Sequence, residues 1–261
     1  MPQLQNIFKV VSNEKLCPAF WRMRVDAPSI GKTVKPGQFI HIRVKEGLEP
    51  FFRRPFSVYR ALEHVEIFYE VVGPGTRILS EMKTGDGIDV LGPVGTQFEL
   101  PGDNVKQVVM VAGGIGIAPF LILSDVLKER EGLELVLLYG GRDKDHVYEM
   151  KEFKDNGCQV HVATDDGSAG VHGRVTGLFD KIQCDPETTV IYTCGPNAMM
   201  AAVQRFAKER HLRGQAACEE VMACALGACL GCSIPTTEGY KTVCYDGPAF
   251  DLQTVLFEKI T

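Results

Sequence analysis

The sequence predicts an α+β multidomain protein: an antiparallel Greek-key β-barrel, then an α/β domain with a parallel sheet, then a small C-terminal subdomain. Three observations predict this order. Roughly the first hundred residues alternate apolar and polar side chains with a period of two. Beyond them, apolar strand-like runs alternate with helical runs, and a cluster of cysteines follows near the end of the chain. We expect the three parts to cover residues 1–100, 101–215 and 216–261.

The predicted barrel depends on short runs with strand periodicity, separated by Gly, Pro and Asn. Short strands at this spacing are typical of antiparallel barrels. One helix is expected over residues 76–82, because Ile78, Leu79 and Met82 would share one of its faces. The strand-like runs read FKVVS, FWRMRVD, GQFIHIRV, PFSVYR, HVEIFYEVV and GIDVLG.

The predicted parallel sheet depends on a different pattern. Continuous β-branched runs separated by amphipathic helices indicate parallel strands that are covered on both faces. In four places such a run precedes a helical one: VVMVA before FLILSDVLKER, ELVLLYG before VYEMKEFKD, QVHVATD before VTGLFDKI, and TVIYTCG before NAMMAAVQRFAKERH. The tail beyond about residue 215 shows no long element.

Composition and charge exclude several classes of protein. The 261 residues carry a net charge of -5, which argues against a nucleic-acid surface because phosphate binding needs clustered Lys and Arg. The longest stretch of apolar residues, 108–123, is shorter than the roughly 20 residues that cross a bilayer. The N-terminal residues contain no apolar signal core, so we expect a cytoplasmic protein. Nine cysteines in such a chain indicate reduced thiols, metal ligation or redox chemistry.

The segment RRPFS, residues 53–57, offers groups that suit a ligand with a diphosphate and a flat ring system. An arginine fork binds two phosphate oxygens at once, Phe56 presents a flat apolar face, and Ser57 a donor. The alternative is a pair of exposed arginines beside a core phenylalanine. The later GPGT, residues 73–76, favours the ligand-binding interpretation, because its N–H groups sit where a helix would begin.

Two strand-to-helix turns are candidates for a nucleotide site. AGGIGIAP, residues 112–119, follows a predicted strand and would let phosphates approach the backbone, although it lacks G-x-G-x-x-G spacing. YTCGPNAMM, residues 192–200, places Cys194 at the carboxyl end of its strand, where ligands bind in open α/β sheets. The alternatives are a glycine turn that serves only strand–helix packing and a small buried core cysteine.

The cysteine cluster has the spacing of an iron-sulfur site. Cys224, Cys229, Cys232 and Cys244 form C-x4-C-x2-C followed by the fourth cysteine, the plant-type pattern for a [2Fe–2S] centre. Small residues between them let the loop turn its N–H groups toward sulfur. Structural zinc usually shows two C-x2-C hooks, whereas this segment has one, so zinc and inert thiols are the weaker alternatives.

Taken together, four motifs resemble those of the ferredoxin reductase superfamily, in order and spacing over nearly the whole chain. They are R-P-F-S at 54–57, G-D-G-I-D-V-L-G-P-V-G at 85–95, G-G-I-G-I-A-P at 113–119 and C-G-P at 194–196. The tail is similar to that of electron transfer subunits of type B dihydroorotate dehydrogenase. The similarity lies in E-E-V-M-A at 219–223, the cysteine spacing and Y-D-G-P at 245–248.

The resemblance implies which residues hold FAD, NAD and the cluster, and it implies no catalytic residue in this chain. Asp165 and Asp166 would contact the nucleotide ribose or belong to a solvated turn, and Arg142 and Arg174 leave NAD and NADP undecided. FAD would be bound by Arg54, Pro55, Phe56, Ser57, Tyr69, Glu70, Val71, Gly75 and Thr76. The nicotinamide nucleotide would be bound by Gly113, Gly114, Gly116, Cys194, Gly195 and Pro196. Many members of the superfamily have Tyr where this chain has Phe56, so we assign no phenol hydrogen bond there.

The resemblance also implies a partner. A separate FMN-bearing catalytic subunit would oxidise dihydroorotate in pyrimidine biosynthesis, in a heterotetramer of two subunits of each kind. Electrons would pass through [2Fe–2S] and FAD to NAD⁺, with flavin as the adapter between single electrons and hydride. The alternatives are a flavin and iron-sulfur reductase subunit of another complex (hydrogenase, sulfide or ferredoxin-linked) and a non-catalytic zinc scaffold.

Overall fold

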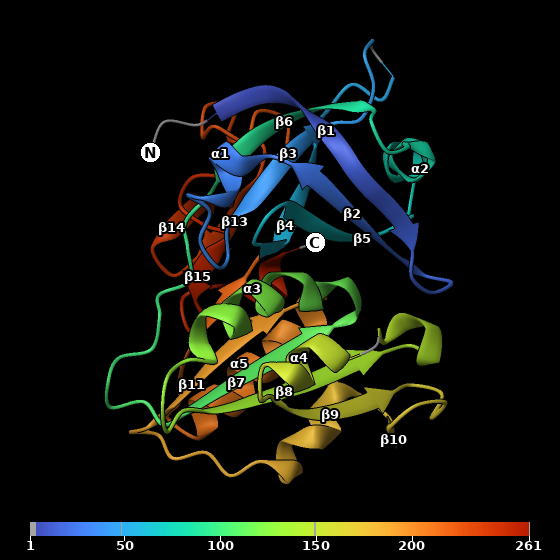
Figure 1. Cartoon of the computed structure of the whole chain (residues 1–261). Helices are drawn as coiled ribbons and strands as arrows, with labels where there is room; N and C mark the ends of the chain where they lie inside the picture. The colour runs from blue at the N-terminus through green and yellow to red at the C-terminus, as the bar shows by residue number, and fades with distance from the viewer. Residues whose placement is uncertain (1–3, 48, 149, 261) are drawn as a thin grey trace.

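The computed structural model describes residues 4–47, 49–148 and 150–260. A β-barrel built from the N-terminal third lies on one side of a sheet domain, and the C-terminal segment packs beside both (Figure 1). Within the described ranges, no helix combines the length and the apolar character that crossing a membrane requires.

Six antiparallel strands close the barrel in the order β1-β2-β5-β4-β3-β6, and this confirms the predicted barrel. Two short helices lie between strands: α1 (Pro28–Gly31), which was not expected, and α2 (Pro74–Glu81), which confirms the predicted helix within two residues. The strands are β1 (Leu4–Lys15), β2 (Phe20–Asp26), β3 (Phe39–Arg43), β4 (Arg54–Ala61), β5 (Val65–Glu70) and β6 (Gly87–Val94).

The register of β3 and β4 decides what the barrel presents to the rest of the molecule. Phe56 and Val58 belong to the barrel core. Side chains alternate across a strand, so Pro55 and Ser57 point outward. Phe39 lies opposite Ser57 in the ladder and packs outside the barrel against residues of the sheet domain and the C-terminal segment.

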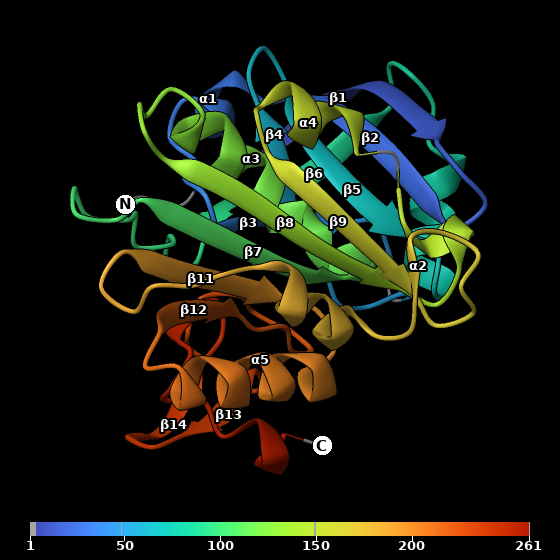
Figure 2. The same cartoon turned by 90° about the horizontal axis from the view of Figure 1, so that it is seen from below.

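The second sheet confirms the predicted parallel arrangement. Its order is β10-β9-β8-β7-β11-β12-β15, with the last strand antiparallel and the others parallel. Helices α3 (Ala118–Leu127) and α4 (Lys151–Asp155) cover the face toward the barrel, and α5 (Asn197–Glu209) covers the other face (Figure 2). The strands are β7 (Gln107–Gly113), β8 (Glu134–Gly141), β9 (Gln159–Thr164), β10 (Val171–His172), β11 (Thr189–Cys194), β12 (Arg213–Ala217) and β15 (Ala249–Asp251).

Two of the expected helical runs are shorter or tighter than the sequence suggested. In the run 147–155, the α-helix begins at Lys151, and Val147 and Tyr148 instead pack along the barrel-facing core; residue 149 lies outside the described residues. The run 175–182 forms the 3-10 helix η3 (Val175–Lys181), in which Gly177 lowers the α-helical propensity. The remaining 3-10 helices are η1 (Gly114–Ile117), η2 (Lys144–His146) and η4 (Phe257–Lys259).

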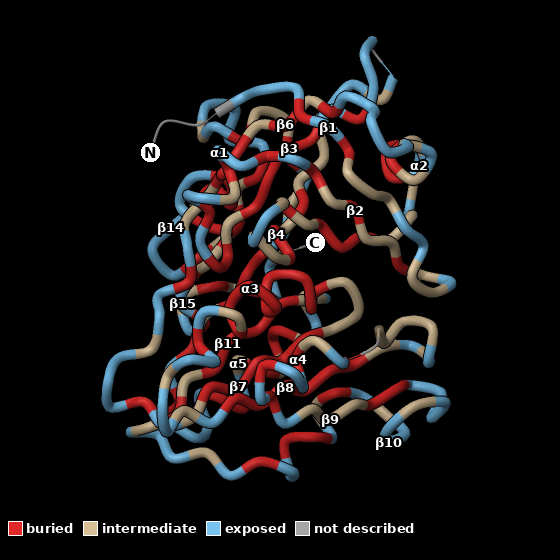
Figure 3. Tube along the Cα trace, in the orientation of Figure 1, coloured by how far each residue is buried: buried red, intermediate tan, exposed pale blue. Residues whose placement is uncertain are grey.

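The C-terminal segment does not stand apart from the other two parts. It forms a hairpin, β13 (Ser233–Thr236) and β14 (Gly239–Thr242), and then adds β15 to the edge of the sheet. It also touches the barrel, because the Thr96 amide donates to the Gly247 carbonyl at 2.5 Å. The buried interior is therefore continuous from the barrel through the sheet to the tail (Figure 3), and the boundaries proposed from the sequence stay predictions.

Candidate functional site

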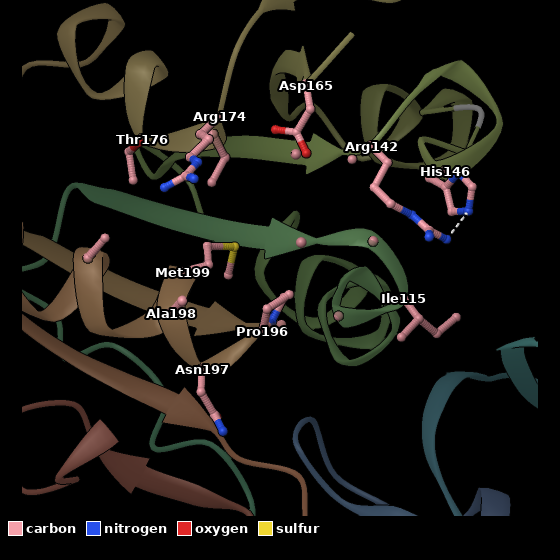
Figure 4. A pocket seen from close by; sticks show the side chains of 18 of the residues that line it. Ile115, Arg142, His146, Asp165, Arg174, Thr176, Pro196, Asn197, Ala198 and Met199 are labelled. Carbon is pink, nitrogen blue, oxygen red and sulfur yellow. Dashed lines mark hydrogen bonds between the residues drawn. The ribbon is translucent and has the colours of Figure 1, made fainter. Parts of the chain in front are cut away.

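Two cavities meet where the barrel faces the carboxyl ends of the parallel strands. One has a volume of about 590 Å³ and is walled by β4, the end of β5 and residues 217–222. The other has a volume of about 1060 Å³ and is walled by the turns after β7, β8 and β11 (Figure 4). Glu70, Ile115 and Glu219 line both cavities, so the two spaces adjoin. Ligands of open α/β sheets bind at this edge of the sheet.

The smaller cavity gathers most of the residues predicted to hold FAD. Ser57 and Pro55 reach it because they point out of the barrel. Tyr69 is buried, its hydroxyl donates to Asn13 at 2.9 Å, and burial raises the pKa of its phenol. The predicted residues in this wall are Arg54, Pro55, Phe56, Ser57, Tyr69, Glu70 and Thr76.

The start of α2 brings Arg54 and Gly75 together. A Cβ at Gly75 would lie 2.3 Å from Nε of Arg54, so the guanidinium can cross this helix end only over a glycine. Thr76 accepts from the amides of Val72 and Gly73 at 3.0 and 3.2 Å, so its hydroxyl closes the helix start. An arginine fork beside free helix N–H groups suits a diphosphate.

Val71 and Gly75 occupy different positions from the other predicted flavin residues. Neither is among the described residues that line the two cavities; Val71 packs against the barrel core. Gly75 has no Cβ, and this leaves the space that the Arg54 guanidinium occupies. Their contact with a flavin stays a prediction.

The larger cavity brings the two predicted nucleotide turns into contact. A Cβ on Gly116 would lie 2.3 Å from the Cys194 carbonyl oxygen, and a Cβ on Gly113 would lie 2.8 Å from the Pro196 ring. These glycines therefore allow the end of β11 to approach the turn after β7. Gly113, Gly114, Gly116, Gly195 and Pro196 all line this cavity.

Cys194 faces the smaller cavity, and not the larger one that holds its neighbours. The thiol is fully buried, and desolvation followed by the nearby Glu219 raises its pKa. At neutral pH it is a neutral thiol, which favours a packing role against a ligand in the smaller cavity over nucleophilic chemistry.

Charged side chains border the larger cavity. Arg142 lies 2.5 Å from Nε2 of His146, and Glu70 of the barrel lies 3.7 Å from the same arginine (Figure 4). Asp165 and Arg174 line the same space on the side of β9 and η3. Asp166 is not among the described lining residues; its carboxylate accepts from Ser168 and closes a turn.

The four predicted cluster cysteines lie in two pairs. Cys229 is among the groups that lower the pKa of the Cys224 thiol, and the Cys244 amide donates to Sγ of Cys232 at 3.5 Å. Across the described chain, no three or more His, Cys, Asp or Glu side chains converge on a single metal-ion position. Two pairs of thiols suit two irons with two thiolates each.

The loop that carries these cysteines turns its amides toward sulfur. Leu226 donates to Cys224 at 3.3 Å and Gly227 donates to Cys244 at 3.2 Å. Desolvation raises the pKa of Cys224, but the Leu226 amide and its neighbours lower it to about 7. Ala225 and Leu230 adopt positive φ of 56° and 57°, which is uncommon for residues with a Cβ and concentrates at functional sites. The donor set therefore fits a [2Fe–2S] cluster.

Glu219 is a site residue that sequence reasoning missed. It lines both cavities, and desolvation by the surrounding protein atoms raises the pKa of its carboxyl, although its surface is exposed to the cavity space. It stands two residues after β12 and five before Cys224. Its position at the carboxyl end of a parallel strand was the signal that would have found it.

Comparisons with known proteins agree with this arrangement. The iron-sulfur cluster binding domain of dihydroorotate dehydrogenase B matches residues 219–256. The oxidoreductase NAD-binding domain matches residues 110–205. These matches cover the cysteine segment and the strands around the larger cavity.

Among solved structures, the NADH-dependent reduced ferredoxin-NADP oxidoreductase, studied for flavin-based electron bifurcation, contains a similar chain. The two are 30% identical with a TM-score of 0.86, over 97% of this chain and 91% of that one. A ferredoxin NADP+ reductase from Neisseria gonorrhoeae with bound FAD and NADP shares the fold. It has a TM-score of 0.66 at 22% identity, over 79% of this chain and 91% of its own.

Full-length relatives decide the family. The electron transfer subunit of dihydroorotate dehydrogenase B (NAD(+)) from Desulforamulus reducens is 35% identical, over 96% of this chain and 97% of its own. The subunit of the same name from Bacillus mycoides is 34% identical over 98% of this chain and 100% of its own. The chain therefore belongs to the family of dihydroorotate dehydrogenase B (NAD(+)) electron transfer subunits, and it contains the iron-sulfur cluster binding domain and the NAD-binding domain.

Proposed function

We propose that this chain carries electrons from an FMN-bearing subunit that oxidises dihydroorotate, through a [2Fe–2S] cluster and FAD, to NAD⁺ in pyrimidine biosynthesis. One observation carries the proposal: the two cavities and the cysteine loop are contiguous. Residues 217–222 wall the smaller cavity, and Cys224 follows Met222 by two residues. Two residues span at most about 7 Å, so the cluster borders the flavin cavity.

The bound flavin supplies the exchange between paired electrons of a hydride and single electrons of a cluster. The protein's own residues bind and orient. The Arg54 fork and the first turn of α2 would hold the diphosphate, and Pro55, Phe56, Ser57, Tyr69, Glu70 and Val71 would surround the flavin. Gly113, Gly114, Gly116, Gly195 and Pro196 would hold the nucleotide close to it, and Cys194 would lie against the flavin. Cys224, Cys229, Cys232 and Cys244 would ligate the irons.

An apolar surface beside the cluster supports a partner subunit at this end of the molecule. Phe52 and Val221 line the smaller cavity yet remain exposed, and Phe51 packs edge-on against Phe52 at 5.2 Å. The cysteine loop adds the exposed Leu226, Leu230 and Tyr245. Exposed apolar patches of this kind mark interaction sites, and a subunit docked here would meet the cluster directly. We propose that the partner docks on this surface, in the heterotetramer of two subunits of each kind that the family resemblance implies.

A second function is favoured by the similarity to a chain of the NADH-dependent reduced ferredoxin-NADP oxidoreductase, which matches over most of both lengths. In that case the partner would be a ferredoxin-linked subunit, and the cofactor path within this chain would be the same.

The test is co-expression of this chain with the dihydroorotate dehydrogenase catalytic subunit of its own genome. We expect a stable complex that reduces NAD⁺ with dihydroorotate, while the isolated chain shows flavin and cluster absorption and oxidises NADH with artificial dyes. A chain with both cofactors that neither binds that subunit nor supports dihydroorotate-dependent NAD⁺ reduction would point to the ferredoxin-linked alternative. A colourless chain would end both proposals.

A further inference from the structure

The flavin and nucleotide cavities belong to different parts of the molecule, so their separation depends on how the barrel sits against the sheet. The smaller cavity is walled largely by β4 and the end of β5, and the larger by the turns after β7, β8 and β11. The chain passes between the two parts through the loop from Val94 to Gln107. Contacts across the interface therefore decide the distance between the two bound ring systems.

Most of these contacts are apolar. Phe20, Tyr59 and Phe68 of the barrel share a buried cluster with α3 and its neighbours, and Phe68 packs against Tyr148 at 5.2 Å between ring centroids. The hydrophobic effect that holds these side chains together is itself non-directional, whereas charge-assisted hydrogen bonds constrain the direction between donor and acceptor.

One carboxylate of the sheet domain receives three polar groups of the barrel. Arg22 and Arg60 approach Oε1 of Glu152 at 3.1 and 3.3 Å, and the Tyr59 hydroxyl donates to Oε2 at 3.2 Å. The side chains of Arg22 and Arg60 are only 14% and 16% exposed, so solvent screens these contacts weakly. Charge-assisted hydrogen bonds of this kind are directional.

Glu152 and its three barrel partners, Arg22, Tyr59 and Arg60, form a polar hub, and further hydrogen bonds hold this hub in place. Arg60 binds Asp125 of α3 through two bonds of 2.7 and 3.0 Å, and Asn156 donates to the same carboxylate at 2.9 Å. The same stretch of sheet domain, 142–155, begins with Arg142 and His146, which border the nucleotide cavity opposite Glu70 of the barrel. Both ends of the stretch therefore touch the barrel.

We propose that Glu152 is a positioning residue for hydride transfer, which fixes the barrel and the sheet domain at the angle that brings the nicotinamide ring to the flavin. The inference rests on the proposed placement of FAD and NAD in the two cavities. A near-attack geometry requires the reacting atoms about 3–3.5 Å apart, and a misplacement of about 1 Å costs on the order of 100-fold in rate. The three contacts of Glu152 are directional, so they can fix this geometry in a way that the apolar contacts do not.

The test is Glu152→Gln, which keeps the shape of the side chain and removes its charge. With saturating NADH under anaerobic stopped-flow conditions, we expect the flavin to be reduced about 10-fold more slowly. The FAD content and the dissociation constant of NADH should change less than about two-fold, since no group that lines either cavity is altered. Amide hydrogen exchange should increase in β2, β4 and α4, a readout that is independent of turnover.

Asp155→Asn is the matched control, because it makes the same chemical change on the same helix. Its partner is Lys151 at 2.7 Å, and both side chains are largely exposed. We expect the Asp155→Asn variant to show the wild-type rate of flavin reduction and wild-type amide hydrogen exchange. Glu152→Asp keeps the negative charge but holds it on a shorter side chain, farther from the barrel. Its rate of flavin reduction should lie between those of the wild type and Glu152→Gln.

A double variant, Arg22→Gln with Glu152→Gln, should be no slower than the slower single variant, because both act through one contact. A wild-type rate for Glu152→Gln, or a loss explained wholly by weaker NADH binding, would overturn the proposal. A wild-type protein that retains no FAD, or is not reduced by NADH, would instead overturn the proposed function.

Discussion

The cysteine loop and the glycine turn of the nucleotide cavity are both short, glycine-rich segments, but they would hold their proposed ligands in different ways. In the loop, four thiol side chains at fixed sequence intervals form two pairs, and the small residues between them aim amides at sulfur. In the turn, no side chain carries the binding. Gly113 and Gly116 matter because Pro196 and the Cys194 carbonyl occupy the space where a Cβ would lie. The first site depends on side-chain chemistry and the second on the room that the backbone leaves.

The largest loss of function is expected from a substitution in the cysteine loop. We expect Cys229→Ser to abolish the [2Fe–2S] signal in low-temperature EPR of the reduced protein, and with it electron transfer to the partner, because one iron loses a thiolate. FAD content and NADH oxidation by artificial dyes should be retained. Cys184→Ser, which lies outside the cluster segment, is the control and should keep the signal. Normal transfer to the partner by Cys229→Ser would remove the cluster from the path.

A substitution in the glycine turn should weaken nucleotide binding by steric clash, because no side chain that contacts the nucleotide is removed. In Gly116→Ala the new Cβ would lie 2.3 Å from the Cys194 carbonyl oxygen, so the turn or the end of β11 must shift. We expect NADH affinity to fall about 10-fold or more, with a loss of stability of roughly 1–3 kcal/mol. Titration of flavin absorbance with NADH analogues and thermal unfolding measure the two effects.

Gly177→Ala is the matched control for that prediction. Nothing lies within 4 Å of the position that its Cβ would take. We expect unchanged nucleotide affinity and equal or slightly higher stability. Equal behaviour of the two alanine variants would show that backbone room does not decide this site.

The flavin cavity combines both kinds of binding. Arg54 would bind through its side chain, but that side chain needs the space left by Gly75. We expect Arg54→Ala to weaken FAD binding by about 1.5–3 kcal/mol, the scale of hydrogen bonds to a charged group, which is about 10- to 150-fold in affinity. Flavin retained after desalting, measured by absorbance, checks this. Arg43→Ala, at an exposed position of β3, should retain FAD as the wild type does.

The smallest expected effect is a pH-dependent change in the stability of the folded chain, caused by Glu219. Desolvation raises the pKa of its carboxyl in the folded chain. The unfolded state therefore releases the proton first, and stability falls as the pH rises above the ordinary glutamate value of about 4.3. We expect Glu219→Gln without bound cofactors to melt on the order of 1–2 °C higher than wild type at neutral pH.

The same linkage predicts that the difference disappears below the ordinary glutamate pKa, where both states carry the proton. Glu220→Gln is the control, because the neighbouring carboxylate already accepts the Val221 amide at 2.8 Å. A destabilised Glu219→Gln at neutral pH would mean that the carboxylate has a favourable partner.

The barrel, the parallel sheet and the cluster cysteines were all predicted from local patterns in the sequence. A period of two, a continuous β-branched run and a cysteine interval each involve residues a few positions apart, so one short stretch of chain contains the whole signal. The same holds for Arg54 and Ser57 as neighbours on β4. The expected helix over 147–155 was wrong in its first half, because Val147 and Tyr148 pack on the barrel-facing core, and that contact outweighs local periodicity.

Other parts of the site were decided by tertiary structure alone. The proximity of Arg54 and Gly75, and the convergence of Arg22, Tyr59 and Arg60 on Glu152, join residues far apart in the chain. The packing of the two parts also decided that Glu219 lines both cavities and that the consecutive residues Cys194 and Gly195 line different ones. The sequence by itself determined which chemistry the chain carries, since ligand type and spacing are properties of short segments. Only the packing of the barrel against the sheet decided where those chemistries meet, because the contacts that orient them are long-range and leave no periodic trace.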